Sequence, residues 1–170
     1  MYIDWELNSK EQWARRSNIE IQGIPEAKNE NLLDIFSNLT KMAGFPINVD
    51  TDIDFITRVA PMSSDTKKTK AIVVRFLARY KKDDCLNRLR KLRDLKACDV
   101  GFAGNNSPIY FNDHLTKVNK LLLKDAKRIA RDNGYKWVWV KVTVHFIMVR
   151  RNDTSAVINI LSSEDLKKNK

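Results

Sequence analysis

Apolar and polar residues alternate along this chain with two different periods. In the first regular stretch, Ile19 and Ile21 fall on one side and Glu20 and Gln22 on the other, which predicts a β-strand. Residues 32–43 carry apolar side chains three or four positions apart, which predicts an amphipathic helix. Together the two patterns predict strands at residues 18–24, 53–60, 71–77 and 109–111, and helices at residues 32–43 and 83–95.

In chain order these elements form a β-α-β-β-α-β series over residues 18–112. That order, in about 95 residues, predicts an α+β domain of the ferredoxin-like type, with the size and order of an RNA-recognition motif. Residues 113–170 predict a small α/β C-terminal domain, a basic helix on a three-stranded sheet, which needs support from the first domain. Its predicted elements are a helix at 117–133, strands near 136–141, 143–150 and 156–161, and a closing helix from Ser163.

The segment of residues 1–17 predicts a helix. Ile3, Leu7 and Trp13 are spaced to share a stripe along it. Three interpretations remain open: the end of a coiled coil that makes a homo-oligomer, a helix that packs back on the domain, and a frayed leader.

The basic helix carries the clearest pattern in the chain. Thr116 is placed as its N-cap, and Gly134, which tolerates positive φ, as its stop. On a helical wheel the apolar arc comprises Val118, Leu121, Leu122, Leu123, Ala126, Ile129 and Ala130, and the opposite, cationic arc comprises Lys117, Lys120, Lys124, Lys127, Arg128 and Arg131. Acidic residues lie only at the margins, at Asp125 and Asp132, so pairing within the helix does not explain the cations. The pattern predicts a polyanionic partner.

Charge strengthens this prediction. The 170 residues include 31 basic and 21 acidic ones, a net charge of +10. Residues 1–110 carry 18 basic and 15 acidic residues, whereas residues 111–170 carry 13 and 6. A field of this sign attracts nucleic acid or an acidic membrane surface, and the charge alone does not choose between them.

Other features favour a soluble, intracellular protein. The most apolar run, residues 137–149, contains Lys141 and His145 and is far shorter than a membrane-spanning helix, so no membrane association is expected. Cys85 and Cys98 are too few for a disulfide framework, which predicts a reducing compartment. No signal peptide is visible.

The predicted sheet of residues 18–112 lacks the aromatic platform on which RNA-recognition motifs stack bases. Its outward positions are Glu20 on the first strand and Ala71, Val73 and Arg75 on the third. The cations expected on or beside this face are Arg58, Lys67, Lys68, Lys70 and Arg75. They would hold phosphates without recognising sequence, unless a neighbouring segment covers the face.

Two tryptophans follow the basic helix. Trp137 and Trp139 share one side of the predicted strand, and we expect Trp137 to be buried in the core. Trp139 lies nearer the strand end, where its indole would stack a base while Lys141 and the helix cations hold phosphates.

Catalytic signals are weak. Asp113 and His114 precede the helix, where such a pair is typical of capping, and His145 is isolated. No serine or cysteine has a nucleophile's setting, and no metal-ligand spacing occurs. We expect a non-enzymatic protein without a cofactor or metal.

Three segments resemble a known family: ARRSNIEIQGIPE at residues 14–26, KAIVVRF at 70–76, and IYFNDHLTKVNKLLLKDAKRIARDNGYKWVWVK at 109–141. They are similar to the first-open-reading-frame protein of LINE retrotransposons, in its insect version, whose C-terminal part is shared with the baculovirus few-polyhedra (FP) protein. The resemblance covers nearly all of residues 14–168. It departs in two places, because the family's coiled coil is all but absent and residues 142–147 replace a glycine-containing turn.

The resemblance implies a trimerising coiled coil, a noncanonical RNA-recognition motif and a C-terminal domain that together bind single-stranded RNA or DNA and act as its chaperone. It assigns nucleic-acid contacts to Arg15, Arg16, Lys67, Lys68, Arg75, the helix around Lys120, and Trp139. A cytoplasmic ribonucleoprotein or a nuclear protein is expected. The alternative is a domesticated protein-interaction or self-assembly module with little affinity for nucleic acid.

Overall fold

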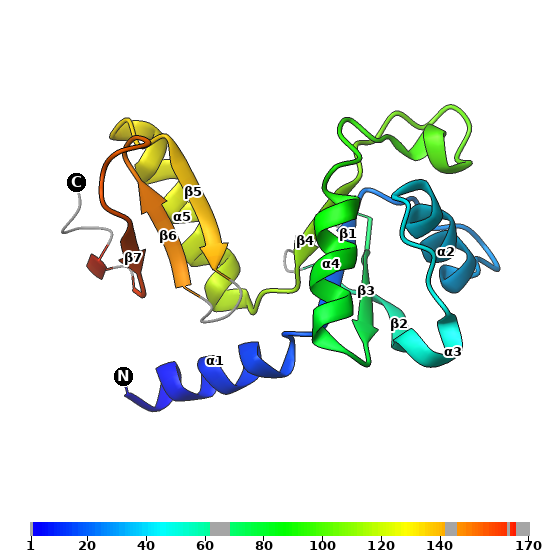
Figure 1. Cartoon of the computed structure of the whole chain (residues 1–170), viewed down its shortest axis with the longest axis horizontal. Coiled ribbons are helices and arrows are strands. Elements are labelled where there is room, and N and C mark those ends of the chain that lie inside the picture. The colour runs from blue at the N-terminus through cyan, green and yellow to red at the C-terminus, as the bar shows by residue number, and fades with distance from the viewer. Residues whose placement is uncertain (1, 62–68, 142–145, 163, 166–170) are drawn as a thin grey trace. The chain divides into compact units, whose positions relative to one another are not determined.

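The computed structural model describes residues 2–61, 69–141, 146–162 and 164–165. The chain forms two compact units, one of residues 15–114 and one of residues 1–14 together with 115–170 (Figure 1). Each unit combines helices with an antiparallel sheet, which confirms the predicted α+β class.

Four strands form the sheet of residues 15–114. They are β1 (Asn18–Gln22), β2 (Ile53–Val59), β3 (Ala71–Phe76) and β4 (Tyr110–Asp113), in the sheet order β2-β3-β1-β4. All neighbouring strands are antiparallel, with Ile19 opposite Val74 and Ile21 opposite Phe111. Side chains directly opposite each other share a face, so these apolar residues all point to one side of the sheet.

Two helices, α2 (Leu32–Met42) and α4 (Arg79–Leu89), pack on that side (Figure 1). The Asn31 side chain begins α2 by accepting from the backbone N–H groups of Leu33 and Asp34. A short helix α3 (Val49–Asp52) and a 3-10 helix η1 (Ala97–Val100) complete the unit. The buried core includes Ile19, Ile21, Phe36, Leu39, Ile72, Val74, Phe76, Cys85, Leu86 and Leu89.

The position of α4 corrects the sequence prediction of residues 83–95. The helix begins earlier, at Arg79, after Ala78, whose side chain offers no cap to mark the start in the sequence. It ends at Leu89, and Asp94 has a φ of 58°, which no helical residue adopts. Leu92 and Leu95 still pack against the core, so apolar spacing continued past the true end of the helix.

The second unit is built around α5 (Lys117–Asp132) and a three-stranded antiparallel sheet. Its strands, β5 (Trp137–Lys141), β6 (Phe146–Arg150) and β7 (Ile158–Ile160), lie in the order β5-β6-β7. The helix buries Ala126 against Ile147, Val149 and Ile160. A helix on a three-stranded sheet was predicted here. Of the predicted closing helix, only Glu164 and Asp165 lie within the described residues, and Asp165 N–H donates to Ser162 Oγ at 3.4 Å.

The N-terminal helix α1 (Tyr2–Ala14) belongs to this second unit. Gln12 is buried, and its Oε1 accepts from the Thr116 backbone N–H at 2.9 Å and from Asn119 Nδ2 at 2.8 Å. Asn8 also bonds Thr116 and Asn119. Three interpretations of residues 1–17 were left open. The one in which the helix packs back on the protein is confirmed for this polar side of α1. Leu7 and Trp13 remain exposed.

Candidate nucleic-acid interface

The helix α5 presents its cations on the side opposite its buried residues. Thr116 Oγ1 accepts from the Asn119 backbone N–H at 3.2 Å, and Gly134 follows the helix with a φ of 70°, so both predicted ends are confirmed. Ala126 and Ala130 are buried. We define the α5 cationic face as Lys117, Lys120, Lys124, Lys127, Arg128 and Arg131.

The ion pairs of Arg128 and Arg131 neutralise little of their charge. Arg128 lies 3.7 Å from Asp125, and Arg131 lies 3.9 Å from Asp132. All four side chains are at least half exposed, and exposed pairs of this kind contribute about 0.2–1 kcal/mol at most. Within the described part of the chain, Lys124 and Lys127 form no ion pair. Their charges are therefore solvated and open to an anionic ligand.

Two residues of the predicted apolar arc are exposed instead. Val118 is 58% exposed and Leu121 is 48% exposed. At 100° per residue, Leu121 lies about 140° around the helix from Ala126, the centre of the buried stripe. The small sheet covers only that stripe, so the predicted apolar arc was wider than the buried side of the helix.

The strand β5 alternates between the core and solvent. Val138 and Val140 pack against the core beneath α5, whereas Trp137 is 46% exposed and Trp139 is 37% exposed. Because alternate side chains point to opposite faces, both indoles lie on the face away from α5. The predicted burial of Trp137 is wrong.

This alternation also separates Trp139 from the α5 cationic face. The sheet lies between them, because α5 packs on the valine side of β5. Lys141 shares the tryptophan side, and no ion pair involves it among the described residues. Trp139 and the helix cations therefore lie on different surfaces. The predicted arrangement, in which Trp139 stacks a base while the helix cations hold its phosphates, does not occur.

Trp137 is held by the turn between β6 and β7. Its Nε1–H donates to Asp153 Oδ1 at 2.8 Å, and Lys136 Nζ lies 2.5 Å from Asp153 Oδ2. These two donors hold the pKa of the Asp153 carboxyl below its usual value. The Lys136 ammonium also lies 5.0 Å from the centroid of the Trp137 ring.

Arg58 has a different position from the one predicted. It lies on the helix side of β2, with the partly buried Ile56, and not on the outward face. Its guanidinium donates to Glu30 at 2.6 Å and to the backbone carbonyls of Ile24 and Pro25. The Arg58 hydrogen bond lowers the pKa of the Glu30 carboxyl. Arg58 therefore holds loops together and is not available to phosphates.

Several other residues of 15–114 that were predicted to contact nucleic acid have partners within the protein. Arg75 faces away from the helices and lies 3.3 Å from Asp54, and Lys70 lies 3.6 Å from Glu26. Arg15 Nη1 lies 3.3 Å from His114 Nε2, and Arg16 is half-buried. Lys67 and Lys68 lie outside the described residues.

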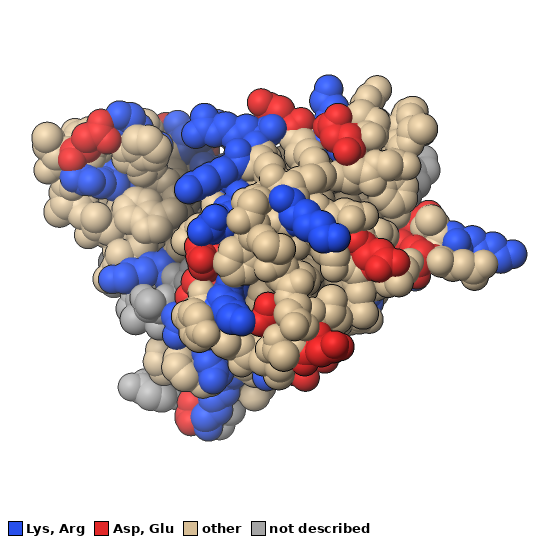
Figure 2. Space-filling model, turned by 45° about the vertical axis from the view of Figure 1, so that its right-hand side comes forward, with Lys and Arg blue, Asp and Glu red and all other residues tan. Residues whose placement is uncertain are grey.

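The centre of the predicted open sheet face is covered. Glu20 and Val73 lie on the side away from α2 and α4, yet both are buried. Among the residues that the structure describes on this face, only Phe55 and Tyr110, toward its edges, are exposed aromatics. Among the described residues, basic and acidic side chains are interspersed on the face shown in Figure 2, without a single large patch of one sign.

Asp113 and His114, which were considered for catalysis, have structural partners, and His145 lies outside the described residues. Asp113 accepts from the buried Lys82 and from Arg90, at 3.2 Å for the arginine. The His114 ring lies instead against Arg15 and Asn18. Burial raises the pKa of the Cys85 thiol to about 12, so the group stays protonated at neutral pH. No group of metal-ligating side chains was found within the described residues.

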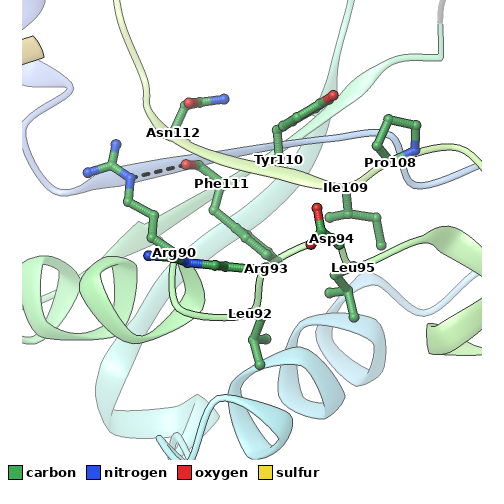
Figure 3. Close-up of a pocket in the computed structure, with 10 residues that line it drawn as sticks. All are labelled: Arg90, Leu92, Arg93, Asp94, Leu95, Pro108, Ile109, Tyr110, Phe111 and Asn112. Atoms are coloured by element: carbon green, nitrogen blue, oxygen red, sulfur yellow. Dashed lines mark hydrogen bonds between the residues drawn. The ribbon is translucent and has the colours of Figure 1, made fainter. Parts of the chain in front are cut away.

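A hollow of about 500 Å³ lies beside β4 and was not foreseen from the sequence (Figure 3). Leu92, Leu95 and Ile109 form its apolar lining, and Arg90 reaches across to donate to the Phe111 carbonyl at 3.3 Å.

Comparison with known proteins supports one part of the chain. Residues 116–170 match the family model of baculovirus FP protein domain 2. The match spans α5 and the β5-β6-β7 sheet, the part for which the FP resemblance was expected. No curated protein matches the chain. In the described residues, no helix has both the length and the apolar character needed to cross a bilayer.

Proposed function

We propose that this protein binds single-stranded RNA or DNA with little sequence preference and acts as its chaperone, without enzymatic activity. The observation that carries the proposal is the α5 cationic face, whose lysines Lys124 and Lys127 are exposed and without ion pairs in the described structure. Basic side chains on a rigid helix suit a phosphate backbone, which every sequence shares. RNA and DNA carry the same phosphates, so either strand is a candidate ligand.

We also propose that the chain has a retroelement origin. The sheet order β2-β3-β1-β4, with α2 and α4 on one face, is compatible with a ferredoxin-like domain. We propose that residues 15–114 are a noncanonical RNA-recognition motif and that the chain is related to LINE first-open-reading-frame proteins. The FP-type match of residues 116–170 concerns the C-terminal part of the chain alone. Two free cysteines and a nucleic-acid ligand favour an intracellular location, in a cytoplasmic ribonucleoprotein or the nucleus.

Filter binding of a single-stranded oligonucleotide across a salt series tests the function. With about four to six cations engaged, log K should fall with log salt with a slope near −3 to −4. Replacing both Lys124 and Lys127 by Gln should weaken binding and make the slope shallower by about 1.4, because two phosphate contacts are lost.

The matched control is Lys28→Gln with Lys41→Gln, which removes the same charge from exposed positions of the other unit. This control should leave the slope nearly unchanged. Absence of binding by the wild type at low salt would contradict the function. Equal slopes for the wild type and the α5 variant would contradict the assignment to α5.

A second candidate is a self-assembly module, favoured by the exposed Trp5, Leu7 and Trp13 of α1. Such side chains are typical of protein interfaces. Sedimentation separates the two candidates, because a stable dimer or trimer without affinity for any single strand would support assembly.

A further inference from the structure

The outer face of the β5-β6-β7 sheet carries two exposed indoles side by side. Trp137 and Trp139 are two residues apart on β5, so their attachment points are roughly 6.5 Å apart. Opposite Trp139 on β6 lies Met148, and opposite Met148 on β7 lies the exposed Asn159. Exposed tryptophans that share a sheet face are costly in water and indicate a ligand surface.

The turn that follows β6 holds this surface in place. Arg150, opposite Trp137, donates through Nε to the Ser155 carbonyl at 2.9 Å and also bonds the Asp153 carbonyl. Asn152 Oδ1 accepts from the Ser155 backbone N–H at 2.8 Å. Asp153, fixed in this way, accepts from the Trp137 indole. An aromatic ring positioned before binding loses less entropy when a ligand stacks on it.

The charges around the indoles favour an anionic ligand, and a single strand supplies both phosphates and bases that stack. Lys136, Lys141 and Arg150 lie on or beside β5 and β6, and the nearby carboxylate of Asp153 is already bonded to Lys136 and Trp137. Each base has a flat face that stacks on an aromatic ring, and adjacent cations bind its phosphates.

We propose that this outer face is a stacking platform for two consecutive unpaired bases, formed by Trp137 and Trp139 and separate from the α5 cationic face. The proposal rests on the proposed function and adds where the bases bind. The platform contributes affinity through the bases, whereas the α5 cationic face contributes through phosphates. The two contributions therefore respond differently to salt and to the removal of bases.

Fluorescence and binding test the platform in the full chain. The protein contains four tryptophans, so Trp5→Phe with Trp13→Phe leaves only Trp137 and Trp139 to report. A single-stranded oligonucleotide should quench this fluorescence, and an abasic strand of equal length should not. Trp137→Ala and Trp139→Ala should each weaken oligonucleotide binding by about 10-fold, with an unchanged salt slope.

The matched control is Trp5→Ala with Trp13→Ala, because these tryptophans are as exposed but lie on α1. Affinity should stay unchanged in the control. Phe at position 137 or 139 should recover part of the loss, and circular dichroism checks that each variant is folded. If the alanine variants lose affinity equally for the oligonucleotide and for the abasic strand, the effect is structural and the platform is overturned.

The outcomes separate the platform from the proposed function. If the wild type binds neither the oligonucleotide nor the abasic strand, the proposed function and the platform are both wrong. Salt-dependent binding that neither quenches Trp137 and Trp139 nor weakens in their alanine variants overturns the platform and leaves the function standing. Loss of self-association in those variants, with nucleic-acid affinity unchanged, assigns the face to a second copy of the chain and also overturns the platform.

Discussion

Arg58 and Lys124 show that one type of charge serves opposite roles in the two units. The Arg58 side chain is 11% exposed and the Glu30 side chain 16%, so each group would be costly to leave without its partner. Lys124 is exposed on a helix and has no ion pair among the described residues. Its charge is solvated by water and balanced by salt ions, which a bound polyanion would displace. Burial therefore decides whether a cation stabilises the fold or is free to bind.

Replacing Glu30 by Gln should destabilise residues 15–114 by about 1–3 kcal/mol at neutral pH, because Arg58 loses its only carboxylate among the described residues. The pKa of Glu30 is lowered in the folded protein, so its contribution is present above the unfolded pKa and is lost as pH falls through the folded value. Denaturant unfolding at pH 7 and below pH 4 measures both effects, and the difference between wild type and variant should shrink in acid.

Glu26→Gln is the control for this experiment. Glu26 pairs with Lys70 at 3.6 Å, and both side chains are about half exposed. Its loss should change stability by less than about 1 kcal/mol. A Glu30 variant with the same small effect, or with an effect that does not depend on pH, would show that the Arg58 pair adds no stability.

Among the elements, α5 and β5 each divide into a covered and an uncovered side. The buried stripe of α5 is narrow and centred on Ala126, and the residues beside it tolerate solvent. On β5 the valines supply the core, and the tryptophans lie opposite. On β5 the largest apolar side chains lie outside the core, whereas α5 packs Leu122, Leu123 and Ile129 against it.

Substitutions on α5 test this narrow stripe. Leu121→Gln should change the free energy of unfolding by no more than about 0.5 kcal/mol, because Leu121 is already half exposed. Ala126→Leu should cost about 1–3 kcal/mol, because Ala126 is packed against Ile147 and Val149. Urea unfolding compares the two, and a larger cost for Leu121→Gln would contradict the assigned faces.

Across the whole molecule, each unit has its own core, and α1 joins the unit of residues 115–170 through buried polar contacts. Gln12 supplies an acceptor to the Thr116 backbone N–H just before α5. A segment at the start of the chain thus stabilises the helix that carries the α5 cationic face.

Gln12→Ala should destabilise the second unit by about 1–3 kcal/mol, because a buried N–H loses its acceptor. Hydrogen exchange should become faster at α5 and β6 and stay unchanged at β1 and β3. Lys10→Ala removes only an exposed pair with Glu6 and serves as the control. Faster exchange in both units would show that α1 does not act on the second unit alone.

Periodicity in the sequence by itself determined most element types, the ends of α5 and its opposed apolar and cationic sides, because these depend on residue spacing and local capping. Only the tertiary structure decided which side of each strand is covered. Alternation places Trp137 with Trp139 and Arg58 with Ile56, but it does not say where a helix will lie. In β5 the helix lies over the valines and leaves both tryptophans exposed, whereas in β2 the loop of residues 24–30 bonds Arg58 and withdraws it from solvent. Burial then sets the role of each side chain, because water competes for exposed groups and not for buried ones.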